Sequence, residues 1–129
     1  DLVYPYRLEM GTNMKTRKGD NLYDFWGDKL NKSMISEMKD YEVLVNLASN
    51  EYSKALKLGS FKQQVITPIF KDYKNGELKV ISFYAKKARG KMANYIITNK
   101  ITDSGDLKLF TNDGYKFTDE NNGEILFSR

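Results

Sequence analysis

Four cations lie within six residues of one another in the segment SFYAKKARGKMANYIITNKI, residues 82–101. They are Lys86, Lys87, Arg89 and Lys91. At 100° per residue, a helix places Lys87 and Lys91 on a fully polar face, whereas Lys86 and Arg89 lie beside small or apolar residues. Because burying an unpaired charge is costly, we expect Lys86 and Arg89 to be the less exposed pair and to bind an anion. The alternative is that both pair with carboxylates of the same protein.

A second polar constellation is NLASNEY, at residues 46–52. Asn46 interrupts an apolar run, and Ser49 and Glu51 then open a predicted short helix. Strand ends that lead into helix N-termini are common ligand sites, since free N–H groups there attract anions. The alternative is a capping arrangement in which Asn46 and Ser49 only satisfy backbone groups.

Two further segments supply charged residues. Asp24 and Asp28 lie one helical turn apart, so they can share a cation, pair with Lys86 or Arg89, or stay surface acids. Too few carboxylates accompany them for a metal site, and none is predicted.

Arg7 and Glu9 lie on one face of an extended segment, because side chains alternate along a strand. We group these polar residues as one predicted cleft. It is lined by Arg7, Glu9, Trp26, Asp28, Asn46, Ser49, Glu51 and Tyr52. If the cleft is an active site, its candidate catalytic residues are Lys86, Glu51 and Asp28.

Cysteine and histidine are both absent from the 129 residues. Their absence excludes Ser-His-Asp and Cys-His catalysis within this chain and argues against zinc, haem and iron–sulfur sites. No cofactor is therefore predicted. No apolar run approaches the roughly 20 residues that span a bilayer, so we expect no membrane association and a cytoplasmic location.

Positive charge is concentrated in part of the chain. Residues 71–100 carry eight cations against two carboxylates, whereas the net charge of the whole chain is only +4. A predicted loop, Gly11–Gly19, adds Lys15, Arg17 and Lys18. A basic segment in a nearly neutral remainder suggests an anionic partner such as nucleic acid, the alternative being a solvated lysine-rich surface.

Hydrophobic periodicity predicts an α+β domain with a mixed sheet, a hairpin and two main helices. The helices are predicted at residues 21–38 and 84–101, with a shorter one at 50–58. Glu42–Leu47 reads as a central strand buried on both faces. Asn-Gly turns at Asn75 and Asn122 predict two hairpins, and Pro68 marks an edge or a bulge.

Four separated motifs resemble the YaaA family of bacterial peroxide-stress proteins. They are PYRLEMG, NLYDFWGD, NLASNEY and FYAKKARG, in family order, and the likeness continues through Asp113-Gly114-Tyr115 to Leu126–Arg129. The resemblance is to the C-terminal half of the family only, and it implies that residues 1–129 form the C-terminal portion of a larger domain.

The resemblance also implies a function. The family is associated with limiting oxidative damage and with DNA binding. We therefore expect a non-enzymatic protein that binds DNA without sequence preference, through phosphate contacts. The expected contacts are Lys15, Arg17, Lys18, Lys86, Lys87, Arg89 and Lys91. The alternative is an enzyme that acts on a phosphate-bearing or other anionic small substrate.

Overall fold

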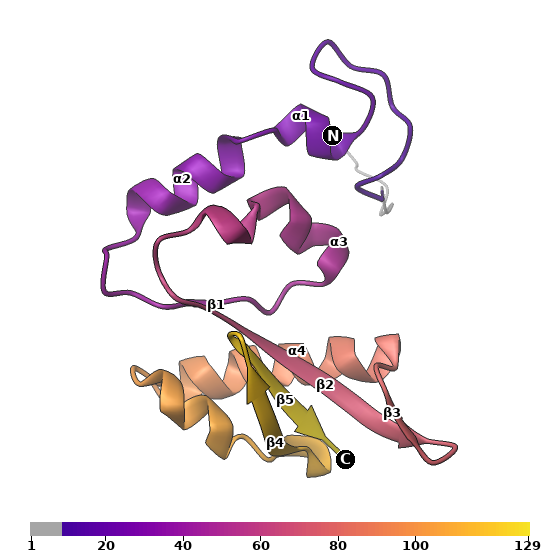
Figure 1. Cartoon of the computed structure of the whole chain (residues 1–129), viewed down its shortest axis with the longest axis vertical. Coiled ribbons are helices and arrows are strands. Elements are labelled where there is room, and N and C mark those ends of the chain that lie inside the picture. Colours follow the sequence, from indigo (N-terminus) through magenta and orange to yellow (C-terminus); the bar gives the residue numbers. More distant parts are fainter. Residues whose placement is uncertain (1–8) are drawn as a thin grey trace, which may run out of the picture. The chain divides into compact units, whose positions relative to one another are not determined.

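A five-stranded mixed sheet and one long helix organise the larger of two compact units. The computed structural model describes residues 9–129 (Figure 1). The larger unit comprises Lys39–Ala48 and Lys62–Arg129, and the smaller unit comprises the described residues up to Met38 together with Ser49–Phe61. Helices and a mixed sheet occur together, so the predicted α+β class is confirmed.

The sheet has the strand order β1-β2-β5-β4, and β3 pairs with β2. Its strands are β1 (Leu44–Val45), β2 (Val65–Lys74), β3 (Glu77–Lys79), β4 (Lys116–Asn121) and β5 (Glu124–Ser128). The long strand β2 is parallel to β1 and β5 and antiparallel to β3, and β4 is antiparallel to β5. The carboxyl ends of β2 and β5 therefore lie side by side.

Both predicted Asn-Gly hairpins are confirmed. Asn75 and Gly76 join β2 to β3, and Asn122 and Gly123 join β4 to β5; all four residues have positive φ. Two successive positive φ values are the signature of a type I′ turn, whose twist matches that of the flanking strands. The strand β4 also carries a register shift between Phe117 and Asp119.

Gly123 is required for a second reason besides its φ of 80°. A Cβ at this position would lie 2.6 Å from the carbonyl oxygen of Val65, whereas a Cβ at Gly76, with nearly the same φ, would meet nothing within 4 Å. We expect Gly76→Ala to lower the free energy of unfolding by about 1 kcal/mol and Gly123→Ala by about 2 kcal/mol or more. Urea denaturation of both variants measures the difference, and equal losses would contradict the close approach.

The prediction that Glu42–Leu47 is a central strand buried on both faces is wrong. Only Leu44 and Val45 form β1, which lies at the end of the sheet order, and Val43 is exposed. The last hydrogen bond between β1 and β2 runs from the Asn46 N–H to the Ile66 carbonyl. In a parallel pair the next bond would be donated by the backbone N–H of residue 68. Residue 68 is proline, which has no N–H, so the ladder stops there. Pro68 is buried, and it lies where one side of β2 is unpaired: β1 pairs with residues 65–66 and β3 with residues 72–74, so β5 is the sole strand beside Pro68 among the described residues. The predicted edge position of Pro68 is therefore confirmed locally, and β2 has no bulge there.

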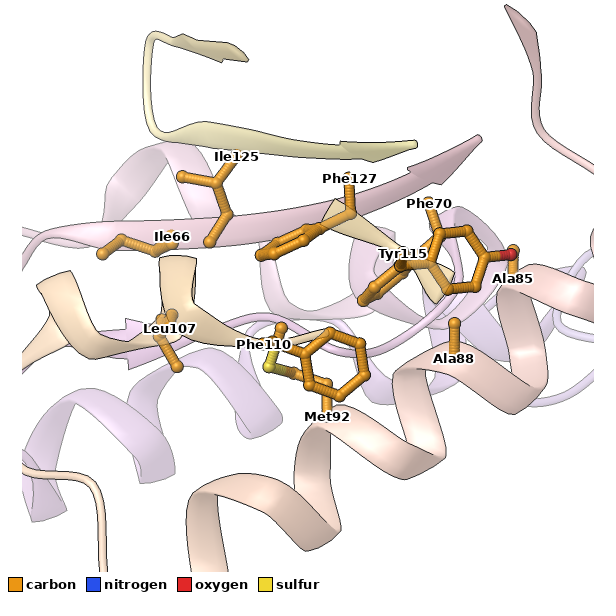
Figure 2. Packing of buried hydrophobic residues seen from close by; sticks show 10 residues of the cluster. All are labelled: Ile66, Phe70, Ala85, Ala88, Met92, Leu107, Phe110, Tyr115, Ile125 and Phe127. Carbon is orange, nitrogen blue, oxygen red and sulfur yellow. The ribbon is translucent and has the colours of Figure 1, made fainter. Parts of the chain in front are cut away.

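Helix α4 (Ser82–Thr98) packs along one face of the sheet (Figure 1). Its buried residues are Ala85, Ala88 and Met92, which join a cluster with side chains from the strands and from η3 (Ser104–Leu109). Phe110 and Tyr115, on either side of the 3₁₀ segment η4 (Asn112–Gly114), complete this cluster. Figure 2 shows this core. It consists of Ile66, Phe70, Ala85, Ala88, Met92, Leu107, Phe110, Tyr115, Ile125 and Phe127.

The smaller unit contains short helices. The predicted helix at 21–38 is broken into α1 (Leu22–Trp26) and α2 (Lys29–Glu37) by Gly27, whose φ is 50°. The helix α3 (Asn50–Ser53) is followed by the 3₁₀ turns η1 (Lys54–Leu56) and η2 (Leu58–Ser60). Trp26, a residue of the predicted cleft, is the last residue of α1 and is 37% exposed.

Candidate nucleic-acid interface

Helix α4 carries four cations and no carboxylate. Its inner face is taken by the buried residues Ala85, Ala88 and Met92, so the cations lie on its remaining faces. Lys86, Lys87 and Lys91 are exposed and Arg89 is half-buried. The helix itself therefore supplies no carboxylate to compensate these charges.

The predicted difference between the two pairs of cations is wrong for Lys86 and Lys91, whereas Lys87 is exposed and Arg89 is half-buried, as expected. Lys86 is exposed, and neither Lys86 nor Arg89 forms an ion pair within residues 9–129. Lys91, expected to be solvated, pairs with Asp113 at 2.5 Å, and Lys87 lies 4.5 Å from the centroid of the Phe83 ring. Helical periodicity could not anticipate the ion pair of Lys91, because Asp113 comes from η4.

An ion pair between buried Asp72 and partly exposed Arg129 joins the carboxyl ends of β2 and β5. Asp72 follows Ile66 and Phe70 on the face of β2 that packs on α4, and its carboxylate accepts a hydrogen bond from Arg129 Nε at 2.5 Å. The Tyr115 hydroxyl donates to the other carboxylate oxygen at 2.8 Å. The Arg129 guanidinium also lies over the rings of Tyr84 and Tyr115, at 5.0 and 4.5 Å from their centroids. We call Asp72, Tyr84, Tyr115 and Arg129 the strand-end cluster.

Charges in the strand-end cluster balance. Burial, and the hydrogen bond to Asp72, raise the pKa of Tyr115 to about 12, so this phenol stays protonated at neutral pH. The hydrogen bond to Asp72 raises the pKa of Arg129. Since every charge has its partner, the cluster is suited to fixing the start of α4 against the sheet rather than to acid–base catalysis.

Sequence reasoning did not select Asp72, Tyr115 or Arg129 as site residues. The alternation of buried and exposed side chains along β2 could have identified Asp72, since it is the next residue after Phe70 on the buried face of the strand. A carboxylate in such a row requires a partner. Arg129 holds the equivalent place after Ile125 and Phe127 in β5, where its N–H donates to the Lys71 carbonyl.

In the smaller unit, the basic loop is a tight turn. Thr16 and Gly19 form an isolated antiparallel bridge that places Arg17 and Lys18 at its tip, and both are exposed, as is Lys15. The ammonium of Lys18 lies 4.8 Å from the centroid of the Phe25 ring. Hydrogen bonding with the Lys29 side chain, and the repulsion of its like charge, lower the pKa of Lys18.

Two acidic residues of the predicted cleft, Asp28 and Glu51, have partners within the smaller unit. Asp28 pairs with Lys57, and this partner lowers the pKa of the Asp28 carboxyl. The Glu51 carboxylate accepts a hydrogen bond from the Met10 N–H at 3.1 Å, while the Glu51 carbonyl accepts one from the Tyr23 hydroxyl at 2.6 Å.

Asn46 fits the backbone alternative rather than a ligand site. Its side-chain oxygen accepts a hydrogen bond from the Ala48 N–H, and its amide donates to the Thr67 hydroxyl. The Ser49 side chain makes no capping hydrogen bond to α3. Asn46 is buried, whereas Glu9, Trp26 and Tyr52 are exposed.

The predicted cleft draws on both units. Asn46, Lys86 and Arg89 belong to the larger unit, and Asp28, Ser49 and Glu51 belong to the smaller. Arg7 lies outside the described residues. The convergence of these side chains therefore stays a prediction.

Two negative observations apply to residues 9–129. No group of three or more Asp and Glu side chains there is arranged to hold a metal ion. Over the same residues, no helix has the length and apolar character needed to cross a membrane.

Comparison with known proteins gives a consistent result. A family model described as peroxide stress protein YaaA matches residues 1–121. Curated UPF0246 proteins are similar over most of the chain: one from Aliivibrio fischeri is 55% identical over 123 residues, and one from Psychrobacter is 53% identical over 126. These matches cover 92% and 93% of this chain but 47% of each relative, so the chain spans about half the length of the relatives it matches.

Proposed function

The chain belongs to the YaaA family of peroxide stress proteins, and from the placement of its cations we propose that it contributes a DNA-binding surface that acts during peroxide stress. Binding is through phosphate groups and does not depend on base sequence. Such contacts fix the protein on the duplex but carry no sequence information.

The single observation that carries the proposal is the charge of α4. A helix with four cations and no carboxylate repels other cations and attracts a polyanion such as DNA. The neutral strand-end cluster fixes the start of this helix, so Lys86 and Lys87 are presented on a rigid element. Positioned charges lose less conformational freedom on binding than mobile ones.

The turn at Thr16–Gly19 supports the proposal from the smaller unit. Lys15, Arg17 and Lys18 are exposed there, and Lys29 adds a further cation next to Lys18. Lysine ammoniums that repel one another are stabilised when an anion such as a phosphate lies between them. The enzymatic alternative has less support, because Asp28, a candidate catalytic residue, is already paired with Lys57.

Salt dependence of duplex binding tests the proposal. Each neutralised phosphate adds about 0.9 to the slope of log K against log salt concentration. Replacing Lys15, Arg17 and Lys18 together by glutamine should therefore lower the slope of the intact protein by about two to three units, with sequence preference unchanged. Fluorescence anisotropy with two unrelated duplexes measures both quantities.

A matched control separates local contact from net charge. Replacing Lys54, Lys62 and Lys116 by glutamine removes the same three charges from other exposed positions. We expect a smaller change in slope for this variant. Equal changes would assign the effect to net charge alone, and no duplex binding at roughly 50 mM salt, where phosphate contacts are strong, would overturn the proposed function.

A further inference from the structure

Two neighbouring aromatic side chains stand exposed at the start of α4. Phe83 is 61% exposed and Tyr84 is 42% exposed, and their ring centroids lie 5.9 Å apart at an angle of 59°. Neither ring belongs to the buried cluster beneath the helix. Exposed aromatic rings of this size form favourable contacts with flat or apolar ligands.

Cations accompany both rings. The ammonium of Lys87, one helical turn after Phe83, lies 4.5 Å from the centroid of that ring. Arg129 lies over Tyr84 while its Nε donates to buried Asp72, so the strand-end cluster holds Tyr84 in place. Exposed rings next to positioned cations are the composition of surfaces that bind single-stranded nucleic acid, where bases stack and phosphates meet cations.

We propose that Phe83 and Tyr84 form an aromatic platform on which unpaired nucleic-acid bases stack, with Lys86 and Lys87 contacting the adjacent phosphates. The inference rests on the proposed DNA binding and narrows it to single-stranded or locally unpaired nucleic acid. Stacking tolerates any base, so the platform adds a preference for unpaired strands without adding sequence specificity.

Charge complementarity favours nucleic acid over a protein partner. No carboxylate occurs between Ser82 and Thr98, and the carboxylates that reach the cations near the platform from other segments, Asp113 and Asp72, are paired with Lys91 and Arg129. Within the described residues, Lys86 and Lys87 form no ion pair, so they leave positive charge beside the two rings. Tyr41 offers a contrast in the same unit: it is 77% exposed and has Lys39 5.7 Å from its ring centroid, but Asp40 and Glu42 flank it. Its acidic neighbours repel phosphate, so Tyr41 is a matched control.

The test compares three fluorescent probes of equal length: a mixed-sequence single strand, the corresponding duplex, and a single strand of abasic nucleotides. In the intact protein, Phe83→Leu should weaken binding of the mixed-sequence strand about tenfold, since stacking of one base on an aromatic ring has that order of effect. Affinity for the duplex and for the abasic strand should not change, because phosphate contacts stay intact. Tyr41→Leu should change none of the three.

A second measurement is independent of affinity. Photo-cross-linking of an iodouracil-containing single strand, followed by mass spectrometry, should attach the base to Phe83 or Tyr84. Attachment elsewhere, or equal losses on all three probes for Phe83→Leu, would overturn the platform. So would a change in self-association with single-strand affinity unaltered, which would indicate a protein contact. Failure of the unmodified protein to bind any probe would instead overturn the proposed DNA binding itself.

Discussion

Replacing Asp72 by alanine is expected to lower the free energy of unfolding by about 3 kcal/mol, the lower end of the usual cost of breaking a buried ion pair by removing one partner, because Arg129 is partly exposed to solvent. The Asp72 side chain is 8% exposed, and its removal takes from Arg129 and Tyr115 the oxygens that accept their hydrogen bonds. A buried hydrogen-bond donor that has lost its acceptor destabilises the fold by the full free energy of its desolvation. Urea denaturation followed by circular dichroism measures the loss.

Asp113→Ala is the matched control for this prediction. Asp113 also forms an ion pair at 2.5 Å, with Lys91, but the two side chains are 36% and 45% exposed. Exposed pairs contribute less than about 1 kcal/mol, and alanine at the positive φ of Asp113 costs about 1 kcal/mol more, so the control should cost less than Asp72→Ala. Asp72→Asn should fall between the two, because it keeps an acceptor for Tyr115 and loses the charge. If Asp72→Ala were no more harmful than Asp113→Ala, the strand-end cluster would not stabilise the fold.

Local signals in the sequence predicted the parts of the fold that depend on local chemistry. The turns at Asn75-Gly76 and Asn122-Gly123 need positive φ at both residues, which few other dipeptides tolerate. The helix at α4 was predicted from its 3.6-residue period, and its buried face, Ala85, Ala88 and Met92, agrees with that pattern.

Features that depend on strand order could not be predicted this way. The apolar run Glu42–Leu47 has the composition of a central strand, yet its neighbour on one side is β2, and Pro68 ends that ladder after two residues. Helical periodicity also extended through Gly27, where the chain takes a φ of 50° and breaks the helix. Hydrophobic patterns report which residues tend to be buried, but not which strand covers them.

In the candidate interface, too, the sequence predicts local features but not contacts between distant segments. The sequence shows that Lys86, Lys87, Arg89 and Lys91 are clustered, but it does not show which residues they contact. Lys91 forms an ion pair with Asp113, which lies 22 residues later in the sequence, and Arg129 pairs with Asp72, which lies 57 residues earlier. Periodicity along one helix contains no information about such distant residues, so it could not predict the ion pair of Lys91.

Stability is also expected to fall as pH rises from about 10 to about 12, because of Tyr115. Burial, and the hydrogen bond to Asp72, raise the pKa of this phenol from 10.0 to about 12 in the folded protein. The folded state therefore holds the proton more tightly than the unfolded chain. The resulting stabilisation is fully present below the unfolded pKa and is lost as pH rises through the folded one. A difference of this size corresponds to about 2–3 kcal/mol.

Tyr115→Phe separates this contribution from general alkaline denaturation. The variant loses the hydrogen bond to a charged group, so it should be less stable by about 1.5–3 kcal/mol at neutral pH. Above pH 10 its free energy of unfolding should fall less steeply than that of the unmodified protein, since the buried proton is gone. Tyr73→Phe removes an exposed hydroxyl, at 66% exposure, and leaves the bond to Asp72 in place. Should Tyr115→Phe and the unmodified protein lose stability in parallel between pH 10 and 12, Tyr115 would not be the group that couples folding to the proton.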